Sequence, residues 1–223
     1  MHAPRVFVSA VICFGTLSAC TNTNSPSPQA NSFDAAAFEA KIITVAKWGG
    51  TPALATAAMP LKSHRISHIT LHHQGETFPP GKDVPAYLRN LQNWSRGVRG
   101  WVDSPYHYVI DLDGNFYAGR DINIPGDTNT AYNPAGHALI EVVGNYENIE
   151  PTATQLEAIA QMMAWLAIKH NIPIERIASH KDYATTACPG KNLYRYIENG
   201  FFKQRVAALL AASTPAVAAV KIN

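Results

Sequence analysis

The sequence predicts a single mixed α/β (α+β) domain in which a central, mostly mixed β-sheet is flanked by helices. Three observations lead to this class. Strand-like and helix-like segments alternate along the chain, there is no internal repeat, and Asp113-Gly114 separates two strand-like runs. An Asp-Gly pair favours a tight hairpin because glycine accepts positive φ, so the sheet should contain an antiparallel pair. The 223 residues are enough for one domain of about 100–200 residues with additional segments.

The first part of the expected domain carries two helices and four strands. Helices are recognised by apolar side chains three or four residues apart, and strands by alternation or by short apolar runs. In chain order we expect a helix over 34–48 that ends at Gly49-Gly50, a strand over 66–73, a helix over 84–98, hairpin strands over 106–111 and 115–119, and a strand over 139–144.

The clearest helix of the sequence begins after Thr152. Gln155 follows three positions later, which is the spacing of a capping box, where each side chain bonds the backbone N–H of the other residue. A single apolar stripe then continues to Asn171 and Pro173, and these two residues end the helix.

A last helix is expected over 192–212, although Gly200 weakens its middle because glycine is a poor helix former. Residues 213–223 are a C-terminal tail with no assigned element. The expected domain therefore covers 34–212.

Composition excludes several classes of protein. Hydrophobic residues make up 47% of the chain and charged residues only 15%, so disorder caused by high charge is excluded. The 18 Lys and Arg residues nearly cancel the 16 Asp and Glu residues, which leaves a net charge of +2 and argues against nucleic acid as a partner. No stretch approaches the roughly 20 apolar residues that span a bilayer.

The N-terminus has the pattern of a secretory leader. A short basic segment, 1–5, precedes an apolar run over 6–17, which is too short for a membrane span. The following Leu17-Ser18-Ala19-Cys20 resembles a bacterial lipobox, in which the leader is cut before a cysteine that becomes lipidated. We therefore expect a signal peptide over 1–19 and lipidation at Cys20; the alternative is an ordinary cleaved leader with a chance cysteine. Cys13 would be lost with the leader.

The segment after the lipidation site is expected to be a tether. Residues 21–32 contain no charge and no large apolar side chain, so they cannot bury enough surface to fold. We assign 20–33 to the lipidated cysteine and this flexible tether. Thr21, in place of Asp, follows Cys20, and by resemblance to Gram-negative lipoproteins this favours the periplasmic face of the outer membrane.

Nine histidines are present, and most need no special role. His64, His68 and His170 are expected to be solvated or hydrogen-bonded. The informative group comprises His72-His73, Tyr106-His107 and the run 179–190, which contains His180 and Cys188. Imidazole and thiolate are preferred zinc ligands, and a catalytic zinc site offers three protein ligands. Spacing alone does not establish a zinc site, because His180 and Cys188 are not at a common close-paired zinc spacing.

Four segments together resemble the zinc N-acetylmuramoyl-L-alanine amidases of the peptidoglycan recognition protein and phage T7 lysozyme superfamily (amidase type 2). They occur in the family's order and span a core of about 60–205: Ile69-Thr70-Leu71-His72-His73, the run 104–114, Gly119-Arg120-Asp121, and the run 179–190 with Cys188-Pro189-Gly190. The resemblance implies a central mixed sheet flanked by helices, with one Zn²⁺ per chain in a surface cleft.

The resemblance also implies the site residues. His72, His180 and Cys188 match the metal ligands, and Tyr106 matches the family tyrosine near the metal. Adjacent strand residues face opposite ways, so only one of His72 and His73 can point to the metal; the family uses the first. Glu141 lies in the middle of an apolar strand, where burial would raise its pKa towards that of a useful general base.

Several roles have simpler alternatives. Tyr106 could be an aromatic residue on a half-buried strand, and Glu141 a charge on an edge strand. Asp182 could orient His180 or its loop through hydrogen bonds, or cap the turn. Phage members of the family have a lysine where this chain has Thr186, so an ammonium group cannot stabilise the oxyanion from that position.

The expected function is zinc-assisted hydrolysis of the amide bond between the muramic-acid lactyl group and L-alanine of peptidoglycan, with peptidoglycan or a muropeptide as partner and a monomeric state. One alternative is a module that binds muropeptide without cleaving it. Another is a thiol hydrolase with Cys188 as nucleophile and His180 as base. The loops 75–83 and 121–133 are expected to set specificity.

Overall fold

The structure is a computed structural model that describes residues 33–55 and 60–213. The predicted signal peptide, the lipidation site at Cys20, the tether up to residue 32 and the tail after residue 213 lie outside the described residues. The elements are α1 (Ala35–Glu39), α2 (Val45–Trp48), β1 (His68–His73), α3 (Val84–Gly97), β2 (Tyr108–Ile110), β3 (Phe116–Ala118), β4 (His137–Val142), α4 (Ala153–His170), β5 (Ile177–Ser179), α5 (Lys191–Glu198) and α6 (Phe201–Ser213), with short 3₁₀ turns η1 (Ile174–Arg176) and η2 (His180–Asp182).

Within the described residues, five strands form one mixed sheet in the order β3-β2-β4-β1-β5. β4 pairs in parallel with both β1 and β2, β1 pairs in parallel with β5, and β2 and β3 are antiparallel. The hairpin predicted at Asp113-Gly114 is confirmed, and Gly114 has a φ of +81°. The predicted fold class is thus confirmed, and β4 is the central strand.

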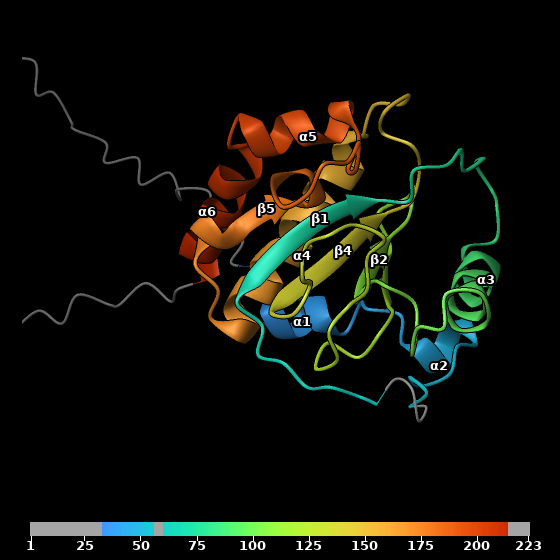
Figure 1. Ribbon diagram of the computed structural model, residues 1–223. Helices are drawn as coiled ribbons and strands as arrows, with labels where there is room; N and C mark the ends of the chain where they lie inside the picture. Colours follow the sequence, from blue (N-terminus) through green and yellow to red (C-terminus); the bar gives the residue numbers. More distant parts are fainter. Residues whose placement is uncertain (1–32, 56–59, 214–223) are drawn as a thin grey trace, which may run out of the picture. The chain divides into compact units, whose positions relative to one another are not determined.

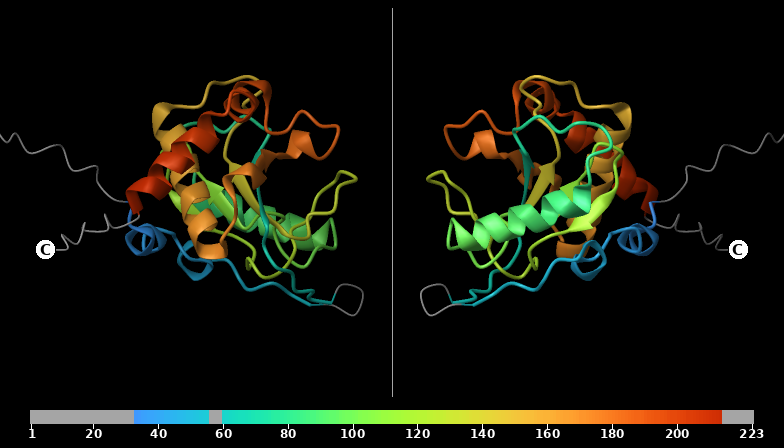
Figure 2. Two further views of the ribbon diagram at one scale, coloured as in Figure 1. Left: turned by 90° about the vertical axis from the view of Figure 1, so that its left-hand side faces the viewer. Right: turned by 90° about the vertical axis from the view of Figure 1, so that its right-hand side faces the viewer.

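Helices cover both faces of the sheet (Figures 1 and 2). On one face α1, α4, α5 and α6 pack over a large core, to which β1 contributes Ile69 and Leu71 and β4 contributes Ile140. On the other face α2 and α3 contribute Trp48 and Leu88 to a smaller cluster. Because strand side chains alternate between faces, Thr70 and His72 of β1 face the α3 side.

The single helix predicted over 34–48 is wrong, because residues 40–44 leave the helical path between α1 and α2. The Ile43 N–H donates to the carbonyl of Phe116, and the Ala118 N–H donates to the carbonyl of Ile43. This segment therefore extends the edge of the sheet next to β3, and its apolar residues pack without helical periodicity. The predicted end is confirmed, because Gly49 caps α2 in the left-handed conformation.

The C-terminal half differs from the prediction in two places. The helix expected over 192–212 is two helices, α5 and α6, which separate at Gly200 with a φ of +76°. The strand β5 was not predicted, because its three residues are too short to show a period. The capping box of Thr152 and Gln155 is present, and Asn171 ends α4 in the left-handed conformation. Of the helices in the described ranges, none is long and apolar enough to cross a membrane.

Candidate metal centre

The alternation of β1 places two neighbouring histidines in different environments. His72 faces the α3 side of the sheet and is 2% exposed. His73 has its Nδ1 within 3.2 Å of the Tyr146 N–H, which donates to it. As expected, the two rings separate, and only His72 joins the cluster described next.

His72, His180 and Cys188 meet although they lie far apart in the sequence. β5 pairs with β1, so η2, which begins directly after β5, places His180 beside the end of β1. The loop from η2 to α5 then returns Cys188 to the same point. One ligand atom from each of the three side chains lies within 4.8 Å of the other two, and the Cys188 Sγ lies 3.6 Å from the His72 Nδ1.

Burial keeps the side chains of this cluster uncharged. Desolvation, reinforced by the neighbouring His180, holds the pKa of His72 well below its usual range. Desolvation also lowers the pKa of His180. Both rings are therefore neutral at pH 7 and have lone pairs available to a metal. Burial raises the pKa of the Cys188 thiol to about 12, so a thiolate at this position needs a positive charge beside it.

The loop 121–133, which was expected to set specificity, also contacts both imidazoles. The Thr130 hydroxyl is hydrogen-bonded to the His180 Nε2 at 2.7 Å, and the Tyr132 hydroxyl lies 3.4 Å from the His72 Nε2. The Tyr132 ring also packs 5.2 Å from the His180 ring. Such outer contacts fix the orientation of ligating histidines. Sequence reasoning missed them because a loop has no periodicity to place its side chains.

Glu141 lies on the central strand, so its interpretation as an edge-strand charge is wrong. It is the register partner of His72 across β1 and β4, faces the same side of the sheet, and is 1% exposed. Burial raises its pKa to about 8, and a 2.7 Å hydrogen bond from the Tyr87 hydroxyl to Oε1 opposes that rise. The other oxygen, Oε2, is buried without a hydrogen-bond partner. A buried carboxyl with one unpaired oxygen in a cleft is characteristic of a functional group.

Tyr106 lies in the loop before β2, not on the strand that was predicted to begin there. Its ring centroid is 5.2 Å from that of His72. Burial, together with the nearby Glu141, holds the pKa of the Tyr106 hydroxyl well above its usual value. The phenol therefore keeps its proton at any physiological pH and can donate a hydrogen bond.

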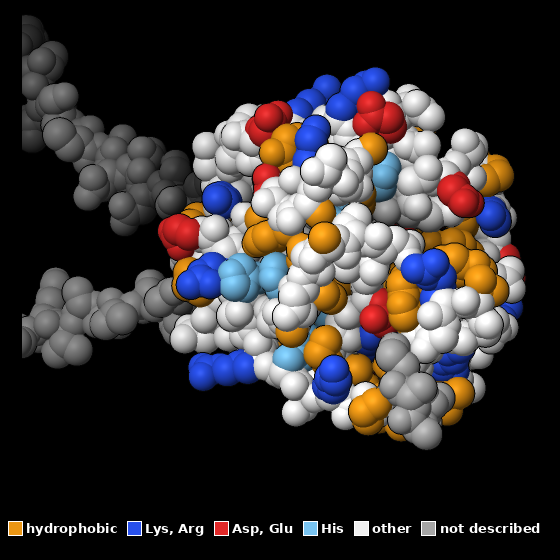
Figure 3. Space-filling model, viewed as in Figure 1, with side chains coloured by type: hydrophobic (Ala, Val, Ile, Leu, Met, Phe, Trp, Pro, Cys, Tyr) orange, Lys and Arg blue, Asp and Glu red, His pale blue; other side chains and the backbone are white. Residues whose placement is uncertain are grey.

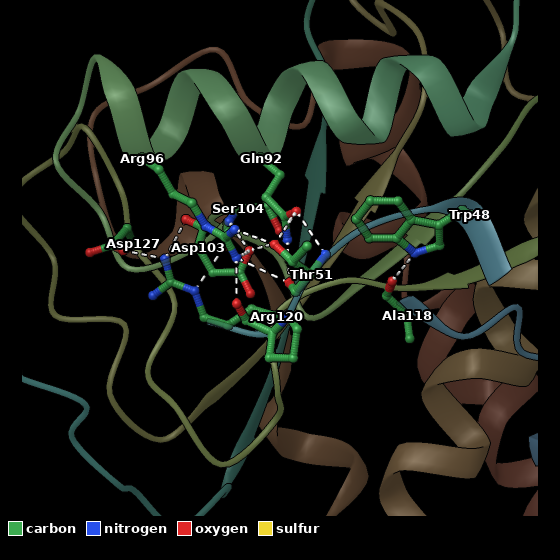
Figure 4. Close-up of polar contacts among 10 residues, drawn as sticks. Trp48, Thr51, Gln92, Arg96, Asp103, Ser104, Ala118, Arg120 and Asp127 are labelled. Carbon is green, nitrogen blue, oxygen red and sulfur yellow. Dashed lines mark hydrogen bonds and ion pairs between the residues drawn. The ribbon is translucent and has the colours of Figure 1, made fainter. Parts of the chain in front are cut away.

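Arg120 links the loop that carries Tyr106 to the loop that carries Thr130 (Figure 4). Arg120 is 3% exposed, and its guanidinium donates to the carbonyls of Ser104 and Asp103, both at 2.8 Å. It also donates to the Pro125 carbonyl and forms an ion pair with Asp127. A planar guanidinium can satisfy several acceptors at once, and this one fixes both loops at the edge of the site.

Two candidate residues of the 179–190 run have local structural roles. Asp182 Oδ2 accepts hydrogen bonds from the Ser179 N–H and hydroxyl, which caps η2, and Oδ1 accepts from the Tyr194 hydroxyl of α5. Asp182 thus caps the turn and makes no hydrogen bond to the His180 ring. The Thr186 hydroxyl accepts from the Cys188 N–H at 3.1 Å, which shapes the turn that presents the sulfur.

A cavity of about 580 Å³ opens onto the cluster. Among the described residues that line it, none is Lys or Arg. The lining residues are His72, His73, Gln74, Glu76, Tyr87, Asn90, Leu91, Trp94, Trp101, Pro105, Tyr106, Asp127, Thr128, Asn129, Thr130, Glu141, His180, Thr186 and Cys188. Both loops expected to set specificity contribute: Glu76 comes from 75–83, and Asp127 to Thr130 come from 121–133.

The three histidines for which no special role was expected are mostly hydrogen-bonded. The His64 Nδ1 accepts from the Gly136 N–H, and its Nε2 is bonded to the carbonyl of Ile122. The His68 Nε2 lies 2.8 Å from a guanidinium nitrogen of Arg176. His170 differs, because its Nε2 is buried without a hydrogen-bond partner.

The sequence matches a known family and several known proteins. The family described as N-acetylmuramoyl-L-alanine amidase matches residues 62–191, more than half of the chain. Peptidoglycan-recognition protein SC2 of Drosophila simulans is 29% identical over 70% of this chain and 84% of its own. A mouse protein named N-acetylmuramoyl-L-alanine amidase is 27% identical over 68% of this chain and 29% of its own.

A solved structure extends the likeness to the fold. The complex of tracheal cytotoxin with the ectodomains of peptidoglycan recognition proteins LCa and LCx has a TM-score of 0.61 and 25% identity, over 70% of this chain and 94% of that one. The family match covers β1, the hairpin and the run that holds His180 and Cys188. The chain belongs to the N-acetylmuramoyl-L-alanine amidase family (amidase type 2), in the superfamily that includes the peptidoglycan recognition proteins.

Proposed function

We propose that this protein is a zinc-dependent amidase that hydrolyses the bond between the lactyl group of N-acetylmuramic acid and L-alanine in peptidoglycan. One observation carries the proposal: the ligand atoms of His72, His180 and Cys188 lie within 4.8 Å of one another, in a cavity that Tyr106 and Glu141 also line. A binding module needs a cavity, but it has no need of a buried acid beside a metal-ligating cluster.

Zinc fits the donor set. Two neutral imidazoles and one thiol are the ligands that zinc prefers, and three protein ligands leave a position for a reacting molecule, as catalytic zinc sites require. Members of this family often depend on zinc. When bound, zinc supplies a Lewis acid that polarises the scissile carbonyl and brings the pKa of a water molecule close to neutrality.

The remaining chemistry belongs to two side chains. Glu141 has a pKa of about 8, so its unpaired Oε2 can accept a proton from the attacking water and return it to the leaving amine of L-alanine. The Tyr106 hydroxyl stays protonated and donates a hydrogen bond to the oxygen on which negative charge develops. Tyr87 orients Glu141 through the bond to Oε1.

The thiol mechanism has less support. The imidazole nitrogen within hydrogen-bonding distance of the Cys188 sulfur is the Nδ1 of His72, not a nitrogen of His180. A thiol with a pKa of about 12 is a poor nucleophile at neutral pH unless a nearby cation stabilises the thiolate, because the thiolate is the reactive form.

Mass spectrometry of the products from a defined muropeptide tests the proposal. Zinc-loaded protein should release a free peptide that begins with L-alanine, and protein treated with a chelator should release none until zinc is restored. Intact muropeptide that is retained but never cleaved by the zinc-loaded protein would favour the non-catalytic binding module. Cleavage that survives complete zinc removal would favour the thiol mechanism.

We further propose that the mature protein is anchored through a lipid on Cys20 at the periplasmic face of the outer membrane. The basis is the leader-like segment 1–19 with Leu17-Ser18-Ala19-Cys20. Cell fractionation tests it: the wild-type protein should sediment with outer membranes, and Cys20→Ser should not. Sedimentation of the Cys20→Ser protein with outer membranes would refute the anchor.

A further inference from the structure

The turn that carries His180 presents two rings on one side. η2 begins with His180, and Tyr183 closes it, with the Tyr183 N–H donating to the His180 carbonyl at 3.1 Å. A 3₁₀ helix has three residues per turn, so side chains three positions apart lie on the same side. Both rings accordingly face Tyr132, whose ring centroid is 5.2 Å from that of His180 and 5.7 Å from that of Tyr183.

Tyr132 connects this turn to the second imidazole of the metal cluster. Its hydroxyl lies 3.4 Å from the Nε2 of His72, and its ring is stacked on that of Tyr183 with 22° between the ring planes. Tyr132 belongs to the loop 121–133, outside the helices and strands, so ring contacts rather than a backbone ladder hold its side chain. The place of the Tyr132 ring therefore sets where its hydroxyl stands beside His72.

A histidine at the start of β4 fixes the two tyrosines against the sheet. The His137 ring meets the Tyr183 ring edge-on, at 86° with 4.7 Å between centroids, and it meets the Tyr132 ring at 65° with 5.5 Å between centroids. Such edge-to-face pairs are favourable because the positive edge of one ring meets the negative face of the other. His137 is 7% exposed, and its Nδ1 is hydrogen-bonded to the buried Thr70 hydroxyl of β1 at 2.8 Å.

The outer edge of this group of rings reaches the surface. His68 stacks on His137 with 11° between the ring planes and 4.7 Å between centroids, and the His68 Nε2 lies 2.8 Å from a guanidinium nitrogen of Arg176. Figure 3 shows histidine side chains beside a basic side chain at the surface where β1 begins. A continuous series of contacts thus joins the surface to the metal cluster.

The three rings lie outside the substrate cavity. Tyr132, His137 and Tyr183 are not among the described residues that line it, whereas His72 and His180 are. A muropeptide in that cavity would contact the two imidazoles and not the rings behind them. A role of the rings in the reaction must therefore pass through His72 and His180, whose orientation depends on such outer contacts.

We propose that Tyr183 is a positioning residue of the metal centre: it packs Tyr132 against the turn of His180 and so holds the Tyr132 hydroxyl beside His72. The inference rests on the proposed function in taking the cluster to bind zinc, but it does not require the amidase reaction. Loss of the Tyr183 ring should lower the affinity for zinc. Loss of its hydroxyl should not, because no hydrogen bond joins that hydroxyl to another described residue.

The zinc affinity of the full-length mature protein, measured by competition with a chromophoric chelator, tests the proposal. Tyr183→Ala should bind zinc about 10-fold more weakly, at the low end of the roughly 10- to 100-fold cost of losing an outer contact, because Tyr183 acts through a second ring. Tyr183→Phe should keep the wild-type affinity. Protein loaded with Co²⁺ supplies a second measurement: its visible absorption bands, which depend on ligand geometry, should shift in Tyr183→Ala and not in Tyr183→Phe.

A double-mutant cycle tests the route from Tyr183 to the imidazoles. In a Tyr132→Ala background, Tyr183→Ala should cost no further zinc affinity, because the ring through which it acts is gone. Losses that add fully would refute a route through Tyr132.

Tyr196→Ala is the matched control, because Tyr196 is also a half-buried tyrosine, and its ring packs edge-on against that of Phe201, 5.3 Å away on the helices α5 and α6. It should reduce the free energy of unfolding and leave the zinc affinity unchanged. The positioning role is refuted if Tyr183→Ala binds zinc like the wild type, or if Tyr196→Ala weakens zinc binding equally.

Tyr183→Leu, which keeps an apolar side chain but has no flat ring, takes the place of Tyr183→Ala if that variant does not fold, and the same loss of affinity is expected. Zinc affinity that depends on Tyr183 in a protein that cleaves no muropeptide would refute the amidase proposal while keeping the positioning role.

Discussion

Replacing Tyr87 by Phe removes one hydroxyl and keeps the ring that packs against Phe78. The hydroxyl donates to Glu141 Oε1 at 2.7 Å, and this bond lowers the pKa of the carboxyl against the larger effect of burial. A hydrogen bond to a charged group is worth about 1.5–3 kcal/mol, and one pKa unit corresponds to about 1.36 kcal/mol. The pKa of Glu141 should therefore rise by about 1–2 units in Tyr87→Phe.

The sign of the effect on activity follows from the role that we propose for Glu141, that of a base. A carboxyl with a higher pKa loses its proton at higher pH, so the acid limb of the kcat/KM profile should move to higher pH by about 1–2 units. The assay is peptide release from a muropeptide across the pH range, with zinc in excess. An unmoved limb, or one that moves to lower pH, would show that Tyr87 does not act through the carboxyl of Glu141.

Tyr117→Phe is the matched control for this experiment. Tyr117 also donates a hydrogen bond to a buried acid, Asp111, at 3.1 Å, but neither residue lines the cavity. Its loss should reduce the free energy of unfolding slightly and leave the pH profile in place.

Three further predictions concern the cluster and its supports. Cys188→Ser should lower the zinc content per chain as measured by metal analysis, because the sulfur is one of the three proposed ligands. Unchanged zinc content in an inactive variant would show that Cys188 is not a ligand. Arg120→Lys should reduce the free energy of unfolding by about 3–5 kcal/mol in denaturant titration, since an ammonium cannot reach the acceptors of the buried guanidinium; a loss below about 1 kcal/mol would contradict its role in joining the two loops. Gly190→Ala should be more destabilising than Gly81→Ala, although both glycines have positive φ. A Cβ at Gly190 would lie 2.3 Å from the Tyr146 carbonyl carbon, whereas one at Gly81 would meet nothing within 4 Å. Equal losses in the free energy of unfolding would mean that the backbone near Cys188 shifts to make room.

Elements with a strong local signal could be predicted from the sequence. The capping box of α4, the Asp113-Gly114 hairpin and the end of α2 at Gly49 each depend on residues within a few positions of one another. The segment 40–44 and the strand β5 could not be predicted, because both are held by hydrogen bonds to distant strands. Gly200 was recognised as a weak point in a helix, but its left-handed conformation, which separates α5 from α6, appeared only in the fold.

The sequence by itself determined which side chains are the candidates for the chemistry, because His72, Tyr106, His180 and Cys188 lie in segments that resemble the family motifs, and because an acid within an apolar strand singles out Glu141. Only the tertiary structure decided how they act together. The pairing of β5 with β1 brings His180 to His72, the central place of β4 buries Glu141, and α3 supplies Tyr87 and Trp94. These contacts join residues many positions apart, and local spacing carries no information about such distances; burial, which sets the pKa values, exists only once the chain has folded.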